Sequence, residues 1–320
     1  MRIVFMGTPE YGLRSLEALV QTGHQVVGVF TQPDKPRGRG GKVQAPPVKR
    51  YAQQQGIPVY QPRRIRQEGV EDLRRLAPEL CVTAAFGQIL SQQLLDIPRL
   101  GTVNVHASLL PQYRGSAPIN WCLINGEKQT GVTTMMTDAG IDTGDILLQS
   151  TLNVLPGETA GELTLRLADL GAKVLLETVE ALEHGHCPRR PQEEGLMSYY
   201  PMLRKEMGEI SWEQDAVSLA NLIHGLNPWP CASTDSPHGR LKLLRAAVEP
   251  GAESPAGCVV QADGRQGLLV ATGDGLLRVV ELQAPGGRAM PAGDYLRGHP
   301  MAVGSLLGAD ASEVRNSDHG

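Results

Sequence analysis

An alternation of two hydrophobic periodicities constrains the fold more than any other feature of this sequence. Short apolar runs at residues 3–6, 26–30, 80–85 and 102–105 are typical of buried strands. Between the first two runs, leucines at 13, 16 and 19 and a valine at 20 are spaced as on one face of a helix. Strands that alternate with helices predict an α/β domain with a mostly parallel, Rossmann-like sheet.

The end of this first domain has a different pattern. Apolar runs at 131–136 and 145–152 flank a Gly-rich turn and predict an antiparallel extension of the sheet. Residues 158–184 then have leucines and a valine at helical spacing, at 163, 167, 170, 174 and 175. This spacing predicts one long amphipathic helix. We therefore expect the first domain to cover residues 1–187.

The second half of the chain predicts a smaller, β-rich domain. Glycines and prolines between 185 and 201 interrupt every periodicity, so we expect a linker at residues 188–207. A helical pattern at 217–226 is followed by four short apolar runs with turn residues between them, at 241–246, 258–261, 267–271 and 276–282. This spacing predicts an OB-like β-barrel over residues 208–308. The polar residues 309–320 predict a disordered tail.

The cysteines and the apolar runs exclude several classes of protein. The five cysteines are scattered and form no CxxC pair, which argues against a disulfide framework or a zinc site and favours the reducing cytoplasm. The cluster at 184–187, with two histidines and a cysteine, lies at a predicted helix end and lacks the HExxH pattern, so we expect no metal. No apolar run approaches the roughly 18 residues of a membrane span, so we expect no membrane segment.

Positive charge is concentrated in one stretch, although the formal net charge is −4. Residues 34–66 contain nine Lys or Arg and a single acid, Asp34. Glycines and a proline within 34–42 predict a mobile loop rather than a helix or a strand. Arg37, Arg39 and Lys42 on this loop are candidates for contact with the phosphates of a nucleic acid. A solvated loop without a ligand is an equally good interpretation.

The densest group of candidate functional residues begins at the end of a predicted strand. Asn104 and His106 are two residues apart there, so both side chains point to the same side. In open α/β sheets this carboxyl end is where ligands bind. Asp142 lies in a Gly-rich acidic turn that can bring a carboxylate beside the imidazole. Taken singly, the three are explained more simply as a strand-end cap, a satisfied polar residue and a turn former.

These residues and their neighbours together form a pattern that is similar to that of a known family. The pattern Asn104-x-His106-x-Ser108-Leu109-Leu110-Pro111, with Tyr113-Arg114-Gly115 and Asp142-Thr143-Gly144-Asp145 downstream, resembles the folate-dependent formyltransferase family. The resemblance implies a metal-independent transfer of a formyl group from 10-formyltetrahydrofolate, the co-substrate. It implies catalytic roles for Asn104, His106 and Asp142. It also implies folate contacts along two segments, Ser108, Leu109, Leu110 and Pro111 in one and Phe86, Gln88, Ile89 and Leu90 in the other.

In the reaction that the resemblance implies, an amine attacks the formyl carbon and the formyl oxygen gains negative charge. The Asn104 amide and a His106 imidazolium are suited to stabilise that oxygen. Asp142 would hold the imidazole charged and help to relay protons. No covalent intermediate with the enzyme is needed, and the GxSxG pattern that would make Ser108 a nucleophile is absent.

The resemblance extends from about residue 2 to about residue 300 and includes segments 5–9, 117–119 and 227–230. It implies the charged methionyl-initiator tRNA of translation initiation as the acceptor, contacted by the basic loop; we expect a monomer. The family uses its second domain in tRNA binding, yet residues 204–301 here contain nine Lys or Arg against eleven Asp or Glu. Two alternatives stay open: a related formyltransferase with a small-molecule amine acceptor, and a folate- or nucleotide-binding module without activity.

Overall fold

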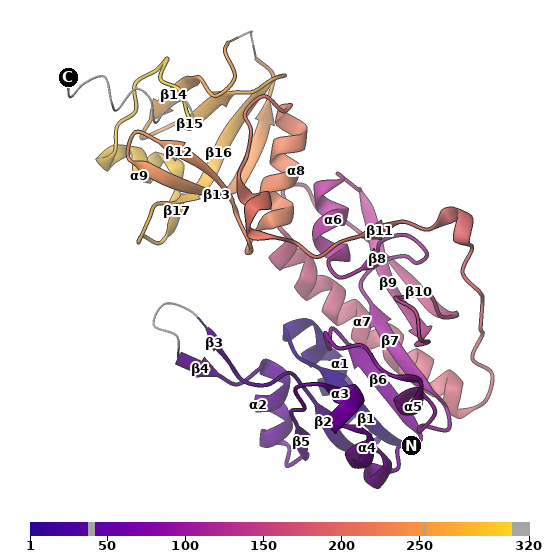
Figure 1. Ribbon diagram of the computed structural model, residues 1–320. Helices are drawn as coiled ribbons and strands as arrows, with labels where there is room; N and C mark the ends of the chain where they lie inside the picture. Colours follow the sequence, from indigo (N-terminus) through magenta and orange to yellow (C-terminus); the bar gives the residue numbers. More distant parts are fainter. Residues whose placement is uncertain (38–41, 252–253, 309–320) are drawn as a thin grey trace. The chain divides into compact units, whose positions relative to one another are not determined.

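The computed structural model describes residues 1–37, 42–251 and 254–308, which form two compact units (Figure 1). The first unit contains Met1–Pro118, Gln129–Asn153 and Thr164–Tyr200. The second contains Ile119–Lys128, Val154–Leu163 and the described part of Pro201–Gly320. The chain therefore enters the second unit twice before its C-terminal part. The domain limits at 187 and 207 stay predictions, and the expected tail at 309–320 lies outside the described residues.

The first unit is built on a seven-stranded sheet with the order β10-β9-β7-β6-β1-β2-β5. The five strands from β7 to β5 are parallel, and β9 and β10 extend the sheet in antiparallel fashion, as predicted. The strands are β1 (Arg2–Gly7), β2 (Gln25–Phe30), β5 (Val59–Tyr60), β6 (Leu80–Ala84), β7 (Thr102–His106), β9 (Gln129–Met136) and β10 (Ile146–Asn153). The Rossmann-like expectation is confirmed.

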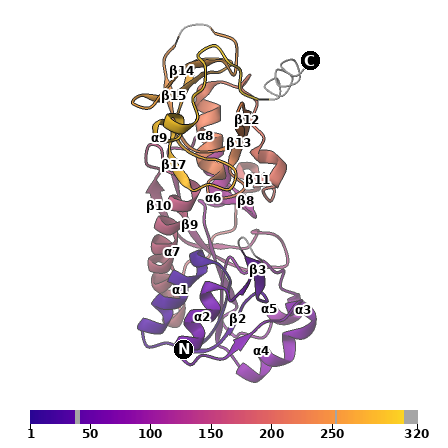
Figure 2. The same ribbon diagram turned by 90° about the vertical axis from the view of Figure 1, so that its left-hand side faces the viewer.

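Helices cover both faces of this sheet (Figures 1 and 2). Ile3, Val4 and Phe5 are all fully buried, because successive side chains of β1 point to opposite faces and each face is covered. On one face, a core cluster joins Val4 to side chains of three short helices. On the other, Gly171 lets α7 approach Val105 of β7 closely. The helices are α1 (Glu10–Gln21), α2 (Pro47–Gln54), α3 (Ile65–Glu68), α4 (Val70–Leu76), α5 (Gln92–Leu95) and α7 (Ala160–Glu183).

The second unit contains an antiparallel sheet with the order β12-β13-β16-β15-β14, in which β17 also pairs with β16. One core cluster joins Trp212, Leu219 and Ile223 to inward-facing leucines and valines of these strands. The small β-rich domain is therefore as predicted. Its elements are β12 (Ala232–Ser236), β13 (Gly239–Glu249), β14 (Val259–Asp263), β15 (Gly267–Ala271), β16 (Leu276–Gln283) and β17 (Ala289–Pro291), with helices α6 (Pro118–Ile124), α8 (Ala216–Leu226) and α9 (Ala292–Gly298).

The described part of residues 34–42 contains strand structure, where the sequence predicted a loop without helix or strand. β3 (Lys35–Arg37) pairs with β4 (Lys42–Gln44) in antiparallel register, so Arg37 lies opposite Lys42. The prediction that Pro36 and the glycines exclude a strand was wrong. A two-stranded ribbon leaves one edge of each strand unpaired, and such an edge tolerates a residue without an N–H. Residues 38–41, including Arg39, lie outside the described part of the chain.

The segment predicted as a linker is bonded along the first unit for part of its length. Two-residue strands β8 (Arg114–Gly115) and β11 (Tyr199–Tyr200) pair in parallel. Short 3-10 helices, η1 (Glu194–Leu196) and η2 (Lys205–Gly208), stand before and after β11. Among the helices that the structure describes, none combines the length and the apolar character needed to cross a membrane.

Candidate active site

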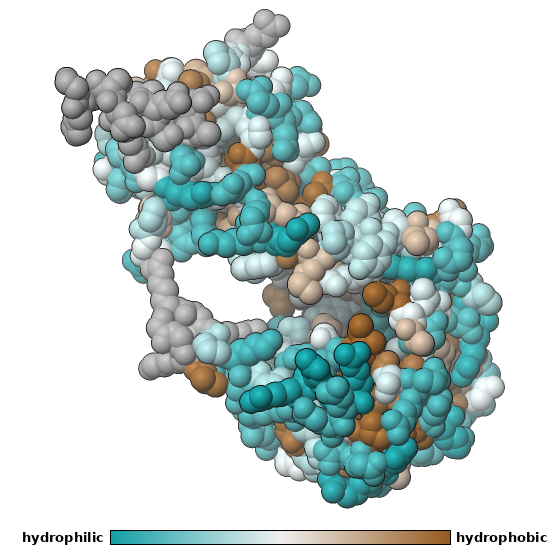
Figure 3. All heavy atoms as spheres, viewed as in Figure 1, coloured by the Kyte–Doolittle hydropathy of each residue, from teal (hydrophilic) through white to brown (hydrophobic). Residues whose placement is uncertain are grey.

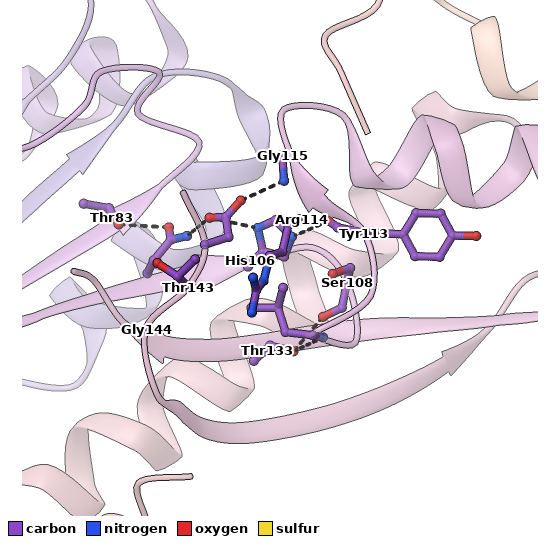
Figure 4. A network of polar contacts seen from close by, with 12 residues as sticks. Thr83, His106, Ser108, Tyr113, Arg114, Gly115, Thr133, Thr143 and Gly144 are labelled. Atoms are coloured by element: carbon purple, nitrogen blue, oxygen red, sulfur yellow. Dashed lines mark hydrogen bonds and ion pairs between the residues drawn. The ribbon is translucent and has the colours of Figure 1, made fainter. Parts of the chain in front are cut away.

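Strand β7 presents Asn104 and His106 to the same side, and both reach one carboxylate oxygen. The polar network around His106 is drawn in Figure 4. Asn104 Nδ2 donates to Asp142 Oδ1 at 3.5 Å, a long hydrogen bond. His106 Nδ1 lies 3.6 Å from that same oxygen. The structure thus brings together the three side chains that the sequence singled out, although Asp142 is 38 residues from Asn104 along the chain.

The imidazole of His106 is held from both sides. Its Nε2 lies 2.9 Å from the carbonyl oxygen of Tyr113, and because a carbonyl only accepts, Nε2 is the protonated nitrogen of this contact. Nδ1 is the nitrogen that faces Asp142. The side chain is only 6% exposed, so its orientation is fixed by these two contacts and by packing. An imidazolium has a proton on both ring nitrogens, and a proton on Nδ1 would point at the Asp142 carboxylate.

The carboxylate of Asp142 is oriented by its backbone and by a neighbouring loop. Asp142 has a φ of 53°, in the left-handed region that a non-glycine residue occupies only when its surroundings impose it. Its Oδ2 accepts a hydrogen bond from the Gly115 N–H at 2.9 Å. A Cβ at Gly144 would lie 1.9 Å from the carbonyl oxygen of Met136, so this position requires glycine. In this conformation of the Gly-rich turn the carboxylate is directed toward β7.

Thr83 on the adjacent strand β6 fixes the orientation of the Asn104 amide. Its hydroxyl donates to Asn104 Oδ1 at 2.9 Å, and the two residues are paired in the parallel register of β6 and β7. The amide oxygen is thereby occupied, and the NH2 group is turned toward Asp142. Sequence reasoning missed Thr83, because the register between two strands about 20 residues apart leaves no signal in either run.

The segments expected to contact folate contain mostly inward-facing side chains. Phe86 and Leu90 are 4% and 7% exposed and belong to the core cluster with Val4. Gln88 is engaged by the protein itself, since its Oε1 accepts from the Ile65 N–H and its Nε2 donates to the Pro62 carbonyl. These three residues shape the loop after β6.

The second such segment follows β7 directly. Ser108 is buried and donates to the Gln112 carbonyl at 2.7 Å, and Leu110 is also buried. Leu109 and Pro111 are half-buried, and the Leu110–Pro111 peptide is cis. The segment is thus a tightly bonded loop beside His106.

Two exposed apolar side chains lie close in sequence to residues of the polar group. Ile89, six residues after Thr83, is 66% exposed, and Ile141, directly before Asp142, is 53% exposed. Apolar side chains also interrupt the hydrophilic surface of the first unit in the space-filling view (Figure 3). Exposed isoleucines on the loops that follow β6 and carry Asp142 are suited to contact a flat heteroaromatic ligand such as a pterin ring. The residues present are therefore compatible with a folate.

A polar network supports the base of the β3–β4 hairpin. Lys49 Nζ donates to Asp34 at 2.7 Å and to Gln61 at 2.8 Å, and Gln61 Nε2 donates to Asp34 at 2.8 Å. The hydrogen bonds from Lys49 and then Gln61 lower the pKa of the Asp34 carboxyl. Lys49 is thus paired within the protein. The backbones of Arg37 and Lys42 are described, and Arg39 lies outside the described residues.

Sequence reasoning also missed a buried arginine beside the site. Arg114 is 3% exposed. Its guanidinium donates to Gln192 Oε1 at 3.0 and 2.9 Å and to the Glu194 carboxylate at 3.2 and 2.8 Å. The hydrogen bond from Arg114 lowers the pKa of Glu194. Arg114 belongs to the Tyr113-Arg114-Gly115 motif, but its partners lie about 80 residues away in the segment expected to be a linker.

The remaining candidate cluster is the group of two histidines and a cysteine at residues 184–187. The rings of His184 and His186 lie 5.9 Å apart at the end of α7. Within the described ranges, no group of three His, Cys, Asp or Glu side chains is arranged to hold a metal ion.

Comparison with known proteins matches both units to one family. The formyl transferase model matches residues 1–179, and the formyl transferase C-terminal domain model matches residues 202–300. A protein of Trichlorobacter lovleyi, named methionyl-tRNA formyltransferase, is 49% identical over 307 residues, which cover 96% of both chains. A protein of the same name from Moorella thermoacetica is 50% identical over 310 residues, covering 96% of this chain and 99% of its own.

Solved structures share the fold at lower identity. HypX from Aquifex aeolicus in complex with tetrahydrofolic acid superposes with a TM-score of 0.65 at 18% identity, over 92% of this chain and 47% of its own. This chain thus spans about half the length of HypX. WlaRD, a sugar 3N-formyl transferase, has a TM-score of 0.63 at 18% identity, over 87% of this chain and 96% of its own. The chain therefore belongs to the formyl transferase family, in the branch whose curated members are named methionyl-tRNA formyltransferase.

Proposed function

We propose that this chain transfers the formyl group of 10-formyltetrahydrofolate to the α-amino group of methionyl-initiator tRNA, for translation initiation. The observation that supports this most is the convergence of the Asn104 amide and the His106 imidazole on Asp142 Oδ1, in a chain that matches proteins of that name over nearly its whole length. We assign the catalytic roles to Asn104, His106 and Asp142. The folate contacts are assigned to the two segments after β6 and β7, with Ile89 as their exposed side chain.

The first task of the site is to stabilise charge on the formyl oxygen. The donor supplies a formyl group that is already activated, because its nitrogen is attached to an aryl ring. Thr83 holds Asn104 Oδ1, and one N–H of the NH2 group donates to Asp142, so the second N–H is the donor toward the formyl oxygen. His106 Nε2 is engaged by Tyr113, so that Nδ1 is the ring nitrogen that can donate. Both donors are fixed before the substrates arrive, which lowers the reorganisation that charge development requires.

The second task is to move a proton. A bond forms between the α-amine and the formyl carbon, the bond from that carbon to the folate nitrogen breaks, and one proton passes from the amine to the departing nitrogen. Asp142 Oδ1, which lies 3.6 Å from His106 Nδ1, takes this proton from the amine through water and returns it to the departing nitrogen. Esterification to tRNA lowers the pKa of an α-amine, so a weak base suffices.

The basic hairpin is assigned to the acceptor. Arg37 and Lys42 are paired across its two strands, one on each side of residues 38–41, and we expect both, together with Arg39, to contact phosphates of the tRNA. We propose that the catalytic domain covers residues 1–187, that the linker covers 188–207 and that an accessory domain covers 208–308. We further propose a monomer in the cytoplasm; all five cysteines are free, as a reducing compartment requires.

The test offers 10-formyltetrahydrofolate together with one of three acceptors: charged initiator tRNA, charged elongator tRNA, or a small amine such as an amino sugar. We expect formyl-methionyl product from the initiator tRNA alone. Formylation of the small amine without reaction of either tRNA would overturn the assignment of the acceptor. Binding of folate without transfer to any acceptor would instead favour a binding module.

A further inference from the structure

Gln192 connects the Asp142 turn to the rest of the first unit through both ends of one amide. Its Nε2 donates to the carbonyl oxygens of Asp142 and Gly144, each at 2.8 Å. Its Oε1 accepts two hydrogen bonds from Arg114, at 3.0 and 2.9 Å. The amide is thus fully oriented, since its oxygen faces the only charged donor in this set and its nitrogen faces two acceptors.

The backbone of the Asp142 turn is in a conformation that hydrogen bonds from neighbouring segments stabilise. Asp142 holds a left-handed backbone conformation that is unfavourable for a residue with a Cβ. Asp138 supports the turn from within, accepting from the Gly140 N–H at 3.0 Å and the Thr143 hydroxyl at 2.7 Å. Gln192 instead holds the turn from outside, at the backbone of Asp142 itself. The direction of the carboxylate follows from that backbone.

The loop that contains Arg114, at the other end of the Gln192 amide, is also held by several hydrogen bonds. Tyr113, Arg114 and Gly115 are consecutive, and they contact His106, Gln192 and Asp142 respectively. Ser198 anchors the same three-residue segment, since its hydroxyl accepts from the Tyr113 N–H and its carbonyl from the Arg114 N–H, each at 2.9 Å. Segment 192–198 is therefore bonded to the loop beside His106 and to the Asp142 turn.

We infer that Gln192 is a positioning residue for formyl transfer, which holds the Asp142 carboxylate against His106 and Asn104. Segment 192–198 is then part of the active-site framework and not a passive connection between domains. This inference rests on the proposed function for the identity of the reaction. The simpler alternative is that Gln192 only attaches the segment to Arg114.

A substitution of Gln192 by glutamate separates these two roles. The carboxylate introduced by Gln192→Glu would still accept from Arg114, but it has no N–H for the two carbonyl groups and places a negative charge beside them. Positioning predicts that Gln192→Glu lowers kcat about 10- to 100-fold while KM for tRNA and for folate changes less than about threefold. Simple attachment predicts a wild-type kcat, and that result would overturn the inference.

Controls keep the result interpretable. Glu193→Gln alters the exposed neighbour in the same segment and should leave kcat unchanged. Gln192→Met has a similar length but neither donor nor charge, and should lower kcat as Gln192→Glu does. It serves as the second variant if the glutamate protein has lost its cooperative thermal unfolding.

Hydrogen exchange tests the inference without using turnover. Amides of residues 137–146 should exchange faster in Gln192→Glu and Gln192→Met than in the wild type, with the protection of β1 and β6 unchanged. Unchanged exchange in 137–146 would rule out the positioning role. If the wild type formylates no tRNA, the proposed function fails, and this exchange comparison still decides whether Gln192 holds the turn.

Discussion

Asp142 Oδ1 lies 3.6 Å from His106 Nδ1, and the opposite ring nitrogen of His106 is occupied by the Tyr113 carbonyl. This relationship decides which atom of the imidazole can act. A histidine free to rotate could offer either nitrogen, whereas here Nδ1 is directed toward the Asp142 carboxylate, whose Oδ1 also accepts from the Asn104 amide. The site therefore has one donor geometry in the absence of substrate, which is the condition for electrostatic stabilisation without reorganisation.

Removal of either donor should reduce the rate of transfer far more than the affinity for folate. We expect Asn104→Ala and His106→Ala each to lower the single-turnover rate about 100- to 1000-fold. Folate affinity, measured by equilibrium titration, should change only a few-fold, because the donors act on charge that develops during the reaction. A near wild-type rate in either variant would show that the assigned residue does not stabilise the formyl oxygen.

Thr83 should matter through Asn104. In Thr83→Val the hydroxyl that holds Asn104 Oδ1 is lost while the shape of the side chain is kept. One orienting hydrogen bond is worth about 1 kcal/mol, so we expect kcat to fall about three- to tenfold. Thr83→Ser, which keeps the hydroxyl, should restore most of the rate. Equal activity of the valine and serine variants in steady-state assays would remove Thr83 from the site.

Arg39 should act on the tRNA alone. We expect Arg39→Ala to raise KM for charged tRNA and to reduce the salt dependence of tRNA binding by about one unit of slope, as the loss of one phosphate contact does. Folate affinity should be unchanged. Arg74→Ala is the matched control, since Arg74 is an exposed arginine of the first unit that pairs with Glu71 on its own helix. Parallel losses of tRNA and folate binding would argue against a dedicated tRNA contact.

The stability of the second unit should depend on pH through Glu162. Hydrogen bonds from the Thr159 backbone and then from Arg245 lower the pKa of Glu162 to about 2 from its ordinary 4.5. A carboxyl with a depressed pKa contributes its stability above the unfolded value, and this contribution is lost as pH falls from about 4.5 toward about 2. The side chain is 48% exposed, so solvent screening limits the effect to about 1 kcal/mol or less.

The measurement is urea unfolding of the wild type and of Glu162→Gln at pH 7 and at pH 3. The difference in unfolding free energy should be present at pH 7 and smaller at pH 3. Glu177→Gln changes an exposed glutamate of the same helix and serves as the control. A difference that stays constant between the two pH values would contradict the assignment to this carboxylate.

Several elements could be predicted because their signal is local. Successive residues are apolar at 3–6 in β1 and at 80–82 in β6, and this pattern alone indicates strands covered on both faces. The spacing of two between Asn104 and His106 places both on one side of a strand, as the structure has them. Their roles and those of the folate segments stay predictions.

Other features had no local signal. The β3–β4 hairpin was predicted as a loop, because each of its strands is only three residues long and neither has an alternation that indicates pairing. Phe86 and Leu90 stay predicted folate contacts, but the burial of their side chains in the core cluster could not be predicted from the segment. Whether an apolar side chain beside a strand end points inward depends on the helices packed over it, which the segment itself does not encode.

The sequence by itself determined the parallel sheet, its antiparallel extension, the β-rich second domain and the identity of the three polar residues at the site. Periodicity is a property of neighbouring residues, so it can be read without knowing what lies across from them. Only the tertiary structure decided which atoms meet: Thr83 on Asn104, Gly115 on Asp142, and Gln192 on the Asp142 turn. These hydrogen bonds join residues from about 20 to 50 positions apart, and their partners are selected by strand register and loop packing, which act between segments.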